Sequence, residues 1–354
     1  MAKPLTAMLK SRAPEIARNG AEQLEEVRVR DVVFSCDDRG AKFLCVTVWS
    51  LLSNYRGAEP IRVNVFEGFG GHSPESKRKL AEVVARFPNA SARYVDVEPA
   101  VAPYADLIMN RAGSRWNVFT WTPVFVPALL PDATGNVIHL DIDMLVAADV
   151  SPLFEIDLGD NLIAAVAEYH RGGGAVESCI WGDGILPPEA ERYFNTGTLV
   201  FNVAKCREER TWERILEWYR EHYGIANRIE QDAWNALYWR RTRLLPLRWN
   251  FHDRLIKSFA KWNVRDRYWL GNPPQECLEA VLEPAILHFW GPKKPWLKSH
   301  RPYRRLYHEA MRAVGQTPPS EPLTAPFHDF AARRNLRRIR QLLDGFRRSG
   351  RAEA

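Results

Sequence analysis

The sequence predicts an α/β protein built on a parallel, three-layer sheet, and three observations support this class. Segments typical of strands and of helices alternate along the first hundred residues, which is the pattern of a sheet covered by helices. Hydrophobic residues make up 46% of the 354 residues, enough to bury a sizeable core. A short apolar run at residues 137–146 is typical of a buried strand and carries two aspartates.

The alternating part begins with a predicted strand at residues 31–36. Apolar residues at helical spacing predict a helix at 41–53. Ser73-Pro74 predicts the start of a second helix, because serine caps a helix and proline suits its first position. The other predicted elements are that second helix at 77–87, strands at 61–66, 92–97, 162–168 and 198–202, an insertion at 99–130, glycine-rich loops at 171–174 and 181–184, helices at 208–223 and 230–239, and an irregular aromatic segment at 241–300.

Asp141 and Asp143 end the predicted strand at residues 137–146. Ligands of open α/β sheets bind beyond the carboxyl ends of the strands. Two carboxylates at such an end can hold a hard divalent cation through their oxygens. The alternative is a solvated strand end, since two aspartates separated by one residue arise easily by chance.

Charge and cysteine content bound the compartment. The net charge is +6, and the five cysteines have no metal-ligand spacing, which indicates free thiols in a reducing compartment. Residues 1–27 lack the apolar stretch of a signal peptide, and no run reaches the roughly 18 apolar residues of a spanning helix. We therefore expect a cytoplasmic protein.

Three regions are predicted: a charged N-terminal segment at residues 1–28, one large domain at 29–315, and a proline-rich linker with a basic helix at 316–354. In the last region Leu336, Ile339, Leu343 and Phe346 share one face, with arginines around it. Such a helix lies well on an anionic membrane surface, and we expect that surface to be the inner face of the membrane; a solvated helix packed on the body is the alternative. No nucleic acid is expected, because no recognition motif accompanies the charge.

His288 lies far along the chain and is followed by Gly291 and Lys294. A single histidine is more often a core residue than a ligand. The turn-forming Gly-Pro and the two lysines after it nevertheless suit anion binding. Two carboxylates and one imidazole would leave positions open on a metal for the oxygens of a pyrophosphate.

Seven short motifs occur in the order typical of glycosyltransferase family 8, which includes bacterial lipopolysaccharide galactosyl- and glucosyltransferases and glycogenin. Over residues 30–300 the chain resembles that family. The motifs are Val32-Val-Phe-Ser-Cys-Asp37-Asp38, Val46-Thr-Val-Trp-Ser-Leu-Leu52, Leu140-Asp-Ile-Asp143, Tyr193-Phe-Asn195-Thr-Gly197, Glu230-Gln231-Asp232, Trp249-Asn250-Phe251 and His288-Phe-Trp-Gly291-Pro-Lys-Lys294-Pro-Trp296.

The resemblance implies the GT-A fold, a Rossmann-like αβα arrangement with a mixed central sheet, and a metal-dependent transferase that retains the anomeric configuration. It implies Mn²⁺, or Mg²⁺, bound by Asp141, Asp143 and His288. It implies a nucleotide-sugar donor, UDP-glucose or UDP-galactose, and a sugar, glycolipid or lipopolysaccharide-type acceptor. The resemblance also assigns residues to each part of the donor. Asp37 would contact the base, with Asp38, Arg39, Asp141 and Ile142 also at the donor, and Gly291 and Lys294 would contact the pyrophosphate. Asn195, Gln231 and Asp232 would line the sugar and the reacting carbon, and Glu168 would contact sugar hydroxyls.

The chemistry favours front-face attack. Cleavage of the sugar–phosphate bond builds positive charge on the ring and negative charge on the diphosphate, which a cation and Lys294 would stabilise. The amide of Gln231 is a poor nucleophile, so we expect Gln231 and Asp232 to stabilise the developing cation instead. The simpler interpretations are a turn at Asn195, local pairing of Asp232 on its helix, and a helix cap at Asp37.

Two positions depart from the family pattern. Arg39-Gly40 follow the first two aspartates, where the family places an aromatic residue that stacks on uracil, and Pro123 stands where it places an arginine, for which Arg111 or Arg115 could substitute. Two other functions remain open: a non-catalytic nucleotide-sugar-binding protein, and a nucleotidyltransferase. The second would need a phosphate loop that the sequence lacks.

Overall fold

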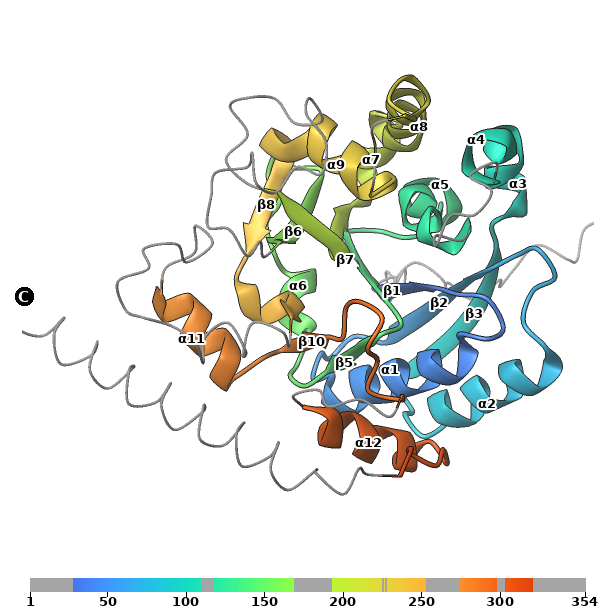
Figure 1. Ribbon diagram of the computed structural model, residues 1–354, viewed down its shortest axis with the longest axis vertical. Coiled ribbons are helices and arrows are strands. Elements are labelled where there is room, and N and C mark those ends of the chain that lie inside the picture. Colours follow the sequence, from blue (N-terminus) through green and yellow to red (C-terminus); the bar gives the residue numbers. More distant parts are fainter. Residues whose placement is uncertain are drawn as a thin grey trace, which may run out of the picture.

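The computed structural model describes residues 28–109, 118–168, 193–224, 226, 228–252, 274–297 and 303–320. Its centre is a seven-stranded sheet with the order β3-β2-β1-β4-β7-β6-β8. Helices cover both faces of this sheet, so that the structure has three layers (Figure 1). The strands are β1 (Arg30–Ser35), β2 (Ile61–Glu67), β3 (Ala90–Asp96), β4 (Asn136–Leu140), β6 (Ile163–Ala167), β7 (Phe194–Asn202) and β8 (Thr242–Leu245).

The first half follows the predicted alternation closely. Helix α1 (Ala41–Asn54) joins β1 to β2, and helix α2 (Pro74–Val84) joins β2 to β3, with all three strands parallel. The Ser73 side chain accepts a hydrogen bond from the Ser76 amide at 3.3 Å, and Pro74 occupies the first turn, as the capping pattern predicts.

The sheet is mixed, which corrects the purely parallel sheet that the alternation predicts and agrees with the mixed sheet implied by the resemblance. Strand β7 runs antiparallel to both of its neighbours, β4 and β6. The register between β6 and β7 shifts between Ala165 and Val166, beside the start of β7. Asn195 therefore lies within a bulged strand and not in the turn that we considered for it.

The apolar run at residues 137–146 forms two strands, where we predicted one. Strand β4 ends at Leu140, the chain turns through Asp141 and Asp143, and β5 (Met144–Val146) begins a second sheet. This sheet has the order β5-β10-β9, with β10 (Ile286–His288) antiparallel to β5 and parallel to β9 (Phe251–His252). Its pairing of His288 with Met144 brings the distant histidine to the aspartates.

Other elements differ from prediction in their extent. The segment 241–300 is not simply irregular, since it contains β8, η6 (Leu247–Asn250), β9, α11 (Pro274–Leu282) and β10. The helix predicted at 208–223 is two helices, α7 (Val203–Glu208) and α8 (Thr211–Glu221), while α9 (Glu230–Tyr238) lies where expected. The short remaining elements are α3 (Glu98–Val101), η1 (Ala102–Tyr104), α4 (Ala105–Met109), η2 (Val118–Thr120), η3 (Thr122–Phe125), α5 (Val126–Leu129), α6 (Ser151–Phe154), η5 (Trp239–Arg241) and α12 (Arg304–Ala313).

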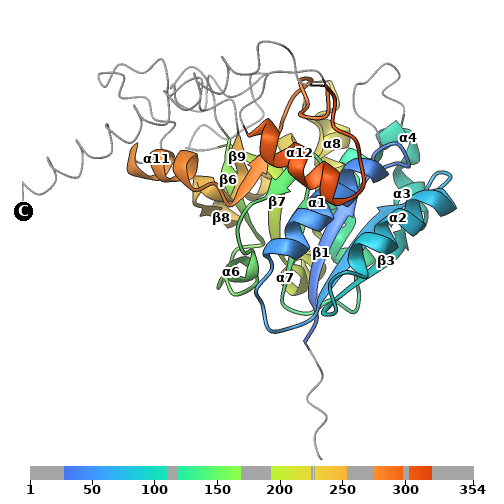
Figure 2. The ribbon, with the colours of Figure 1, turned by 90° about the horizontal axis from the view of Figure 1, so that it is seen from below.

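Two apolar cores lie on the two faces of the large sheet. One joins the sheet to α1, α2, α12 and the small sheet, and the other joins it to α5, α7, α8 and α9. Figure 2 shows α1, α2 and α12 together on one side of the strands. The four described cysteines, Cys36, Cys45, Cys206 and Cys277, are buried free thiols, as predicted. No described helix is both long and apolar enough to cross a bilayer.

Candidate active site

Asp141, Asp143 and His288 form a cluster between the two sheets. Each offers one ligand atom, and these atoms all lie within 4.8 Å of one another. His288 Nε2 is 3.2 Å from an oxygen of Asp143 and 3.6 Å from an oxygen of Asp141. The three residues that the sequence assigns to one metal are thus brought together from places 147 residues apart along the chain, counted from Asp141 to His288.

Charge within the cluster is unequally shared. Burial opposes ionisation of Asp143, but the neighbouring His288 and Lys294 hold the pKa of its carboxyl well below the usual range. Burial at the cavity floor and the adjacent Asp143 charge raise the pKa of Asp141, although its side chain is 43% exposed toward the cavity. Asp143 is therefore ionised, and Asp141 is the aspartate whose ionisation an added cation would favour most.

Gly197 makes room for this cluster. An added Cβ at Gly197 would lie 2.6 Å from His288 Cε1, 2.8 Å from an oxygen of Asp141 and 2.9 Å from the amide oxygen of Asn195. The strand β7 can pass this close only because the residue has no side chain. Two carboxylates and one imidazole around such a space fit a divalent cation such as Mn²⁺ or Mg²⁺.

A cavity of about 270 Å³ opens beside the cluster. Its floor comes from the ends of β1 and β4, and its far wall comes from β7 and the start of α9. The lining residues are Ser35, Cys36, Asp37, Phe119, Thr120, Pro123, His139, Asp141, Ile142, Asp143, Asn195, Thr196, Gly197, Arg228, Ile229, Glu230, Gln231, His288 and Trp290.

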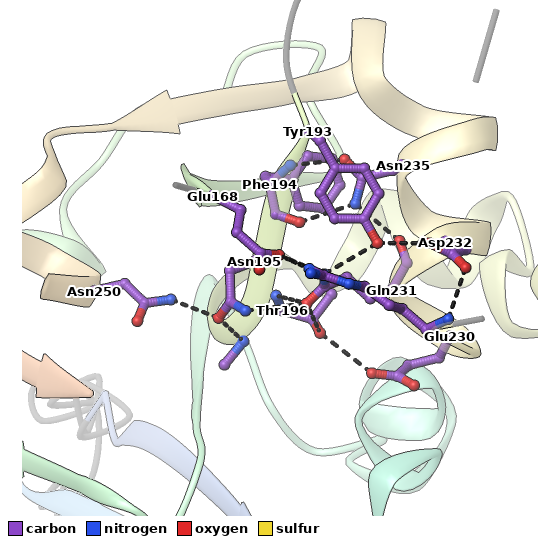
Figure 3. Close-up of polar contacts among 12 residues, drawn as sticks. Glu168, Tyr193, Phe194, Asn195, Thr196, Glu230, Gln231, Asp232, Asn235 and Asn250 are labelled. Carbon is purple, nitrogen blue, oxygen red and sulfur yellow. Dashed lines mark hydrogen bonds and ion pairs between the residues drawn. The ribbon is translucent and has the colours of Figure 1, made fainter. Parts of the chain in front are cut away.

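Gln231 lies at the centre of the far wall with both ends of its amide engaged (Figure 3). Its nitrogen donates to Glu168 at 2.7 Å and to the Tyr193 hydroxyl at 3.0 Å. Its oxygen accepts from the Asn195 amide at 3.1 Å and from the Thr196 backbone at 3.2 Å. An amide held in this way presents a fixed dipole to the cavity.

Asp232 is not among the described residues that line the cavity, and it contacts the Tyr193 hydroxyl (Figure 3). One of its oxygens accepts from the Tyr193 hydroxyl at 2.6 Å, and the other accepts from the Arg228 backbone at 2.7 Å. Glu168 is 10% exposed and forms an ion pair with Arg228, which does line the cavity. Asp232 therefore contacts Tyr193 and Arg228 and lies outside the described lining of the cavity, where we predicted direct proximity to the reacting carbon.

Only some of the residues that were predicted to bind the nucleotide base line the cavity. Asp37 and Ile142 line the cavity, and the Asp37 carboxylate also accepts from the Gly40 amide at 3.0 Å, as a cap would. Asp38 instead accepts from the backbone and hydroxyl of Ser73, and the Arg39 side chain is 95% exposed. Neither of these two belongs to the described lining of the cavity.

The close packing around Gly40 leaves no room for an aromatic side chain at this position. An added Cβ there would lie 2.7 Å from the Cβ of Cys36 and 2.8 Å from the end of the Ile142 side chain. Ile142, which itself lines the cavity, therefore lies where a side chain at position 40 would begin. Pro123 also lines the cavity, and Arg111 and Arg115 lie outside the described residues.

The predicted pyrophosphate residues lie beside the cluster. Gly291 has a φ of 88°, which suits glycine and turns the chain after Trp290. Lys294 reaches back so that its ammonium group contacts Asp143 and donates to the Phe289 carbonyl at 3.1 Å. The lysine charge thus lies next to the proposed metal ligands.

Sequence reasoning assigned no role to several residues that line the cavity or contact its lining residues. Asn250, in the motif Trp249-Asn250-Phe251, bonds to His288 and Asn195. Glu230 is 5% exposed, one of its oxygens has no hydrogen-bond partner, and burial raises the pKa of its carboxyl well above the usual value. His139 is equally buried, and burial lowers its pKa to about 3. Arg228 carried no signal in the sequence.

The comparisons with known proteins agree with this arrangement. A family model described as glycosyl transferase family 8 matches residues 31–300, which contain every lining residue of the cavity. General stress protein A of Bacillus subtilis is 25% identical over 287 residues, covering 80% of this chain and 93% of its own length. Probable galacturonosyltransferase-like 3 of Arabidopsis thaliana is 29% identical over 189 residues, which is 51% of each chain.

Solved structures show the same fold. An active-site mutant of LgtC superposes with a TM-score of 0.66 and 26% identity over 80% of this chain and 95% of that one. LgtC in complex with donor and acceptor sugar analogs gives a TM-score of 0.64 at 24% identity, over 84% of this chain and 99% of that one. The bifunctional protein WbbM gives 0.66 at 24% identity, and the match spans 80% of this chain and half of WbbM.

Proposed function

The chain belongs to glycosyltransferase family 8 and is a glycosyltransferase of the GT-A fold, and on that premise we propose its substrates and mechanism. The proposed reaction moves a hexose from UDP-glucose or UDP-galactose to a carbohydrate or glycolipid acceptor, with retention at the anomeric carbon and with a divalent metal. The observation that carries the proposal is the cluster of Asp141, Asp143 and His288 on one wall of a cavity, with Asn195 and Gln231 on the facing wall.

Asp141, Asp143 and His288 would hold the metal, for which Mn²⁺ is our first choice and Mg²⁺ our second. When bound, the metal supplies positive charge next to the departing diphosphate. Lys294 adds a second positive charge at the same edge of the cavity, close to Asp143. With the metal bound, both charges would be in place before the reaction, which is the condition for effective electrostatic stabilisation.

The charges of the far wall favour an uncharged hexose as the transferred sugar. Arg228 is the described basic side chain on that wall, and it is already paired with Glu168. Glu230 and Asp232 add further acidic groups within the same network. A uronic-acid carboxylate would find no surplus positive charge among the described residues of this wall, so we expect discrimination against donors such as the galacturonosyl group in the name of the plant relative.

The geometry of Gln231 supports front-face attack. Its amide oxygen already accepts hydrogen bonds from Asn195 and Thr196, so its lone pairs are not available for a covalent bond to the sugar. We propose that the acceptor hydroxyl approaches on the side of the leaving group and gives its proton to the diphosphate. The fixed amide dipole of Gln231, supported by Asp232 through Tyr193, stabilises the positive charge that develops on the ring.

A donor screen tests the proposal. UDP-glucose, UDP-galactose, UDP-glucuronic acid and UDP-galacturonic acid are incubated with the protein, with and without Mn²⁺, and release of UDP is measured. We expect metal-dependent hydrolysis of one neutral hexose donor. Binding of UDP-sugars by calorimetry without any release of UDP would instead indicate a non-catalytic binding protein, and faster release from a uronic-acid donor would overturn the assignment of the sugar.

The C-terminal basic segment and the compartment remain predictions, because residues 321–354 lie outside the described part of the chain. We propose that this segment holds the enzyme on the inner, anionic face of a membrane, where a glycolipid acceptor would be presented. Partition onto anionic vesicles should fall when residues 326–354 are deleted. Unchanged partition would remove the membrane from the proposal.

A further inference from the structure

We propose that Asn250 is a positioning residue that fixes the tautomer of His288, with its own orientation set by a directional chain of hydrogen bonds from β7. His288 Nδ1 lies 2.9 Å from the Asn250 amide oxygen, and the Asn250 nitrogen donates to Asn195 at 2.8 Å. The side chains of His288 and Asn250 are buried, and that of Asn195 is half-buried. The consequence for turnover rests on the proposed function, whereas the consequence for metal binding does not.

The direction of the chain is fixed by backbone groups, which can only donate. The backbone N–H of Gly197 donates to the side chain of Asn195 at 2.9 Å, so the atom of Asn195 that faces it must be the amide oxygen. The backbone N–H of Thr196 donates to Gln231 in the same way, which leaves the Asn195 nitrogen as the donor to Gln231. Asn195 therefore has one permitted orientation.

That orientation determines the next two residues. Because the Asn195 oxygen is an acceptor, the atom of Asn250 that contacts it is the amide nitrogen (Figure 3). The oxygen of Asn250 then faces His288, and it can only accept. Nδ1 of His288 must therefore carry a proton, so that in the neutral imidazole, which is the form that binds metal, the lone pair is on Nε2, the nitrogen that faces Asp141 and Asp143.

The far end of the chain is fixed as well. The Gln231 nitrogen donates to Glu168, whose carboxylate accepts only, and Glu168 is held by its ion pair with Arg228. A proton on Nδ1 with a fixed acceptor is the usual means by which a protein prepares a histidine to bind metal through Nε2. Asn250 thus links the metal ligands to the Asn195–Gln231 wall of the cavity.

Two substitutions at one position separate the two contacts of Asn250. Asn250→Leu keeps the shape of the side chain and removes both polar atoms, so the affinity for Mn²⁺, measured by calorimetry without nucleotide, should fall about 10- to 100-fold. Asn250→Asp keeps an acceptor for His288 Nδ1 but removes the donor to Asn195. Its Mn²⁺ affinity should stay within about threefold of the wild type, while kcat for UDP-hexose hydrolysis falls about 10-fold, because the lost hydrogen bond disturbs only the sugar wall.

Asn136→Leu is the matched control. Asn136 is also a half-buried asparagine on the large sheet, but its nitrogen donates to the carbonyls of Phe154 and Ile156, away from the cavity. This variant should lose stability in a thermal melt and keep the wild-type affinity for Mn²⁺. The same melt, run on both Asn250 variants, shows whether each is folded.

The outcomes distinguish this inference from the proposed function. Equal loss of Mn²⁺ affinity in Asn250→Leu and Asn250→Asp, or no loss in Asn250→Leu, overturns the role of Asn250, as does a wild type that binds no Mn²⁺. A wild type that binds Mn²⁺ with the expected order of variants but hydrolyses no UDP-sugar contradicts the proposed function and leaves the role of Asn250 in metal binding intact.

Discussion

The Cα of Gly197 faces the ring of His288 so closely that an added Cβ would lie 2.6 Å from His288 Cε1. The same Cβ would lie 2.8 Å from an oxygen of Asp141, so it would enter the space between two proposed metal ligands. Glycine is therefore needed at position 197 because the side chains around it leave no room for a Cβ. The backbone conformation does not require glycine there, since its φ is not in the left-handed region where glycine is favoured.

Gly197→Ala should accordingly disturb metal binding more than folding. We expect the affinity for Mn²⁺ to fall at least about 10-fold, because His288 must shift to make room and its distance to the aspartates changes. Calorimetry without nucleotide measures this. Gly224→Ala is the control, because an added Cβ at that exposed position meets nothing within 4 Å. Wild-type affinity in Gly197→Ala would show that the ligands do not need this space.

Binding of Mn²⁺ should stabilise the folded protein. At a concentration about 100 times the dissociation constant the gain is about 2.7 kcal/mol, which raises the Tm by several degrees. Asp143→Asn should abolish the rise, because it removes one ligand and the firm anion of the cluster. Asp160→Asn, at a carboxylate that is 98% exposed and paired with Lys205, should keep it. A rise that survives Asp143→Asn would place the metal elsewhere.

Replacement of Gln231 tests its role on the sugar wall. Gln231→Glu places a carboxylate oxygen where a nitrogen now donates to Glu168 at 2.7 Å, so two acceptors would repel each other. We expect kcat for UDP-hexose hydrolysis to fall about 100-fold and the affinity for Mn²⁺ to change little, because Gln231 is not a metal ligand.

Gln231→Ala and a surface control complete that experiment. Gln231→Ala should also lower kcat, and full turnover in this variant would remove Gln231 from the mechanism. Gln316→Ala, which removes an exposed amide that donates to the Lys42 carbonyl, should leave kcat unchanged.

Local signals were enough to predict much of the fold. The cap at Ser73 and the apolar spacing of α1 depend on neighbours within a few residues, and both elements lie where the sequence predicts them. The split of the run at 137–146 into β4 and β5 could not be predicted in this way. It depends on pairing between Met144 and His288, which are far apart in the sequence.

The residues of the site can be separated in the same way, into those that the sequence alone predicts and those that depend on contacts made in the fold. Asp141, Asp143 and His288 belong to motifs in which the residue types themselves indicate a metal, so they could be found without a structure. Asn250 and Arg228 act through the neighbours that folding gives them, His288 and Glu168, and neither residue type indicates such a role in a sequence. Asp38 and Arg39 belong to a motif but do not line the described cavity, because the position of a residue in a motif does not tell which way its side chain points.

His139 makes the stability of the protein depend on pH. It is 2% exposed on β4, and burial lowers its pKa from 6.5 to about 3. Below pH 6.5 the unfolded chain takes up a proton at this residue and the folded chain does not, so stability falls as the pH falls toward 3. Above pH 6.5 this contribution is fully present.

Substitution of His139 should flatten that dependence. Between about pH 6.5 and about pH 5 the histidine accounts for a loss of about 2 kcal/mol in the free energy of unfolding, since each pKa unit corresponds to about 1.4 kcal/mol. His139→Phe keeps a ring on β4 but cannot be protonated, so urea denaturation at the two pH values should show a smaller difference than in the wild type. His222→Phe, at a half-buried histidine beyond α8, should keep the wild-type difference. An unchanged difference in His139→Phe would mean that the imidazole is accessible to protons in the folded state, and the cavity wall would then have to open near β4 for that to occur.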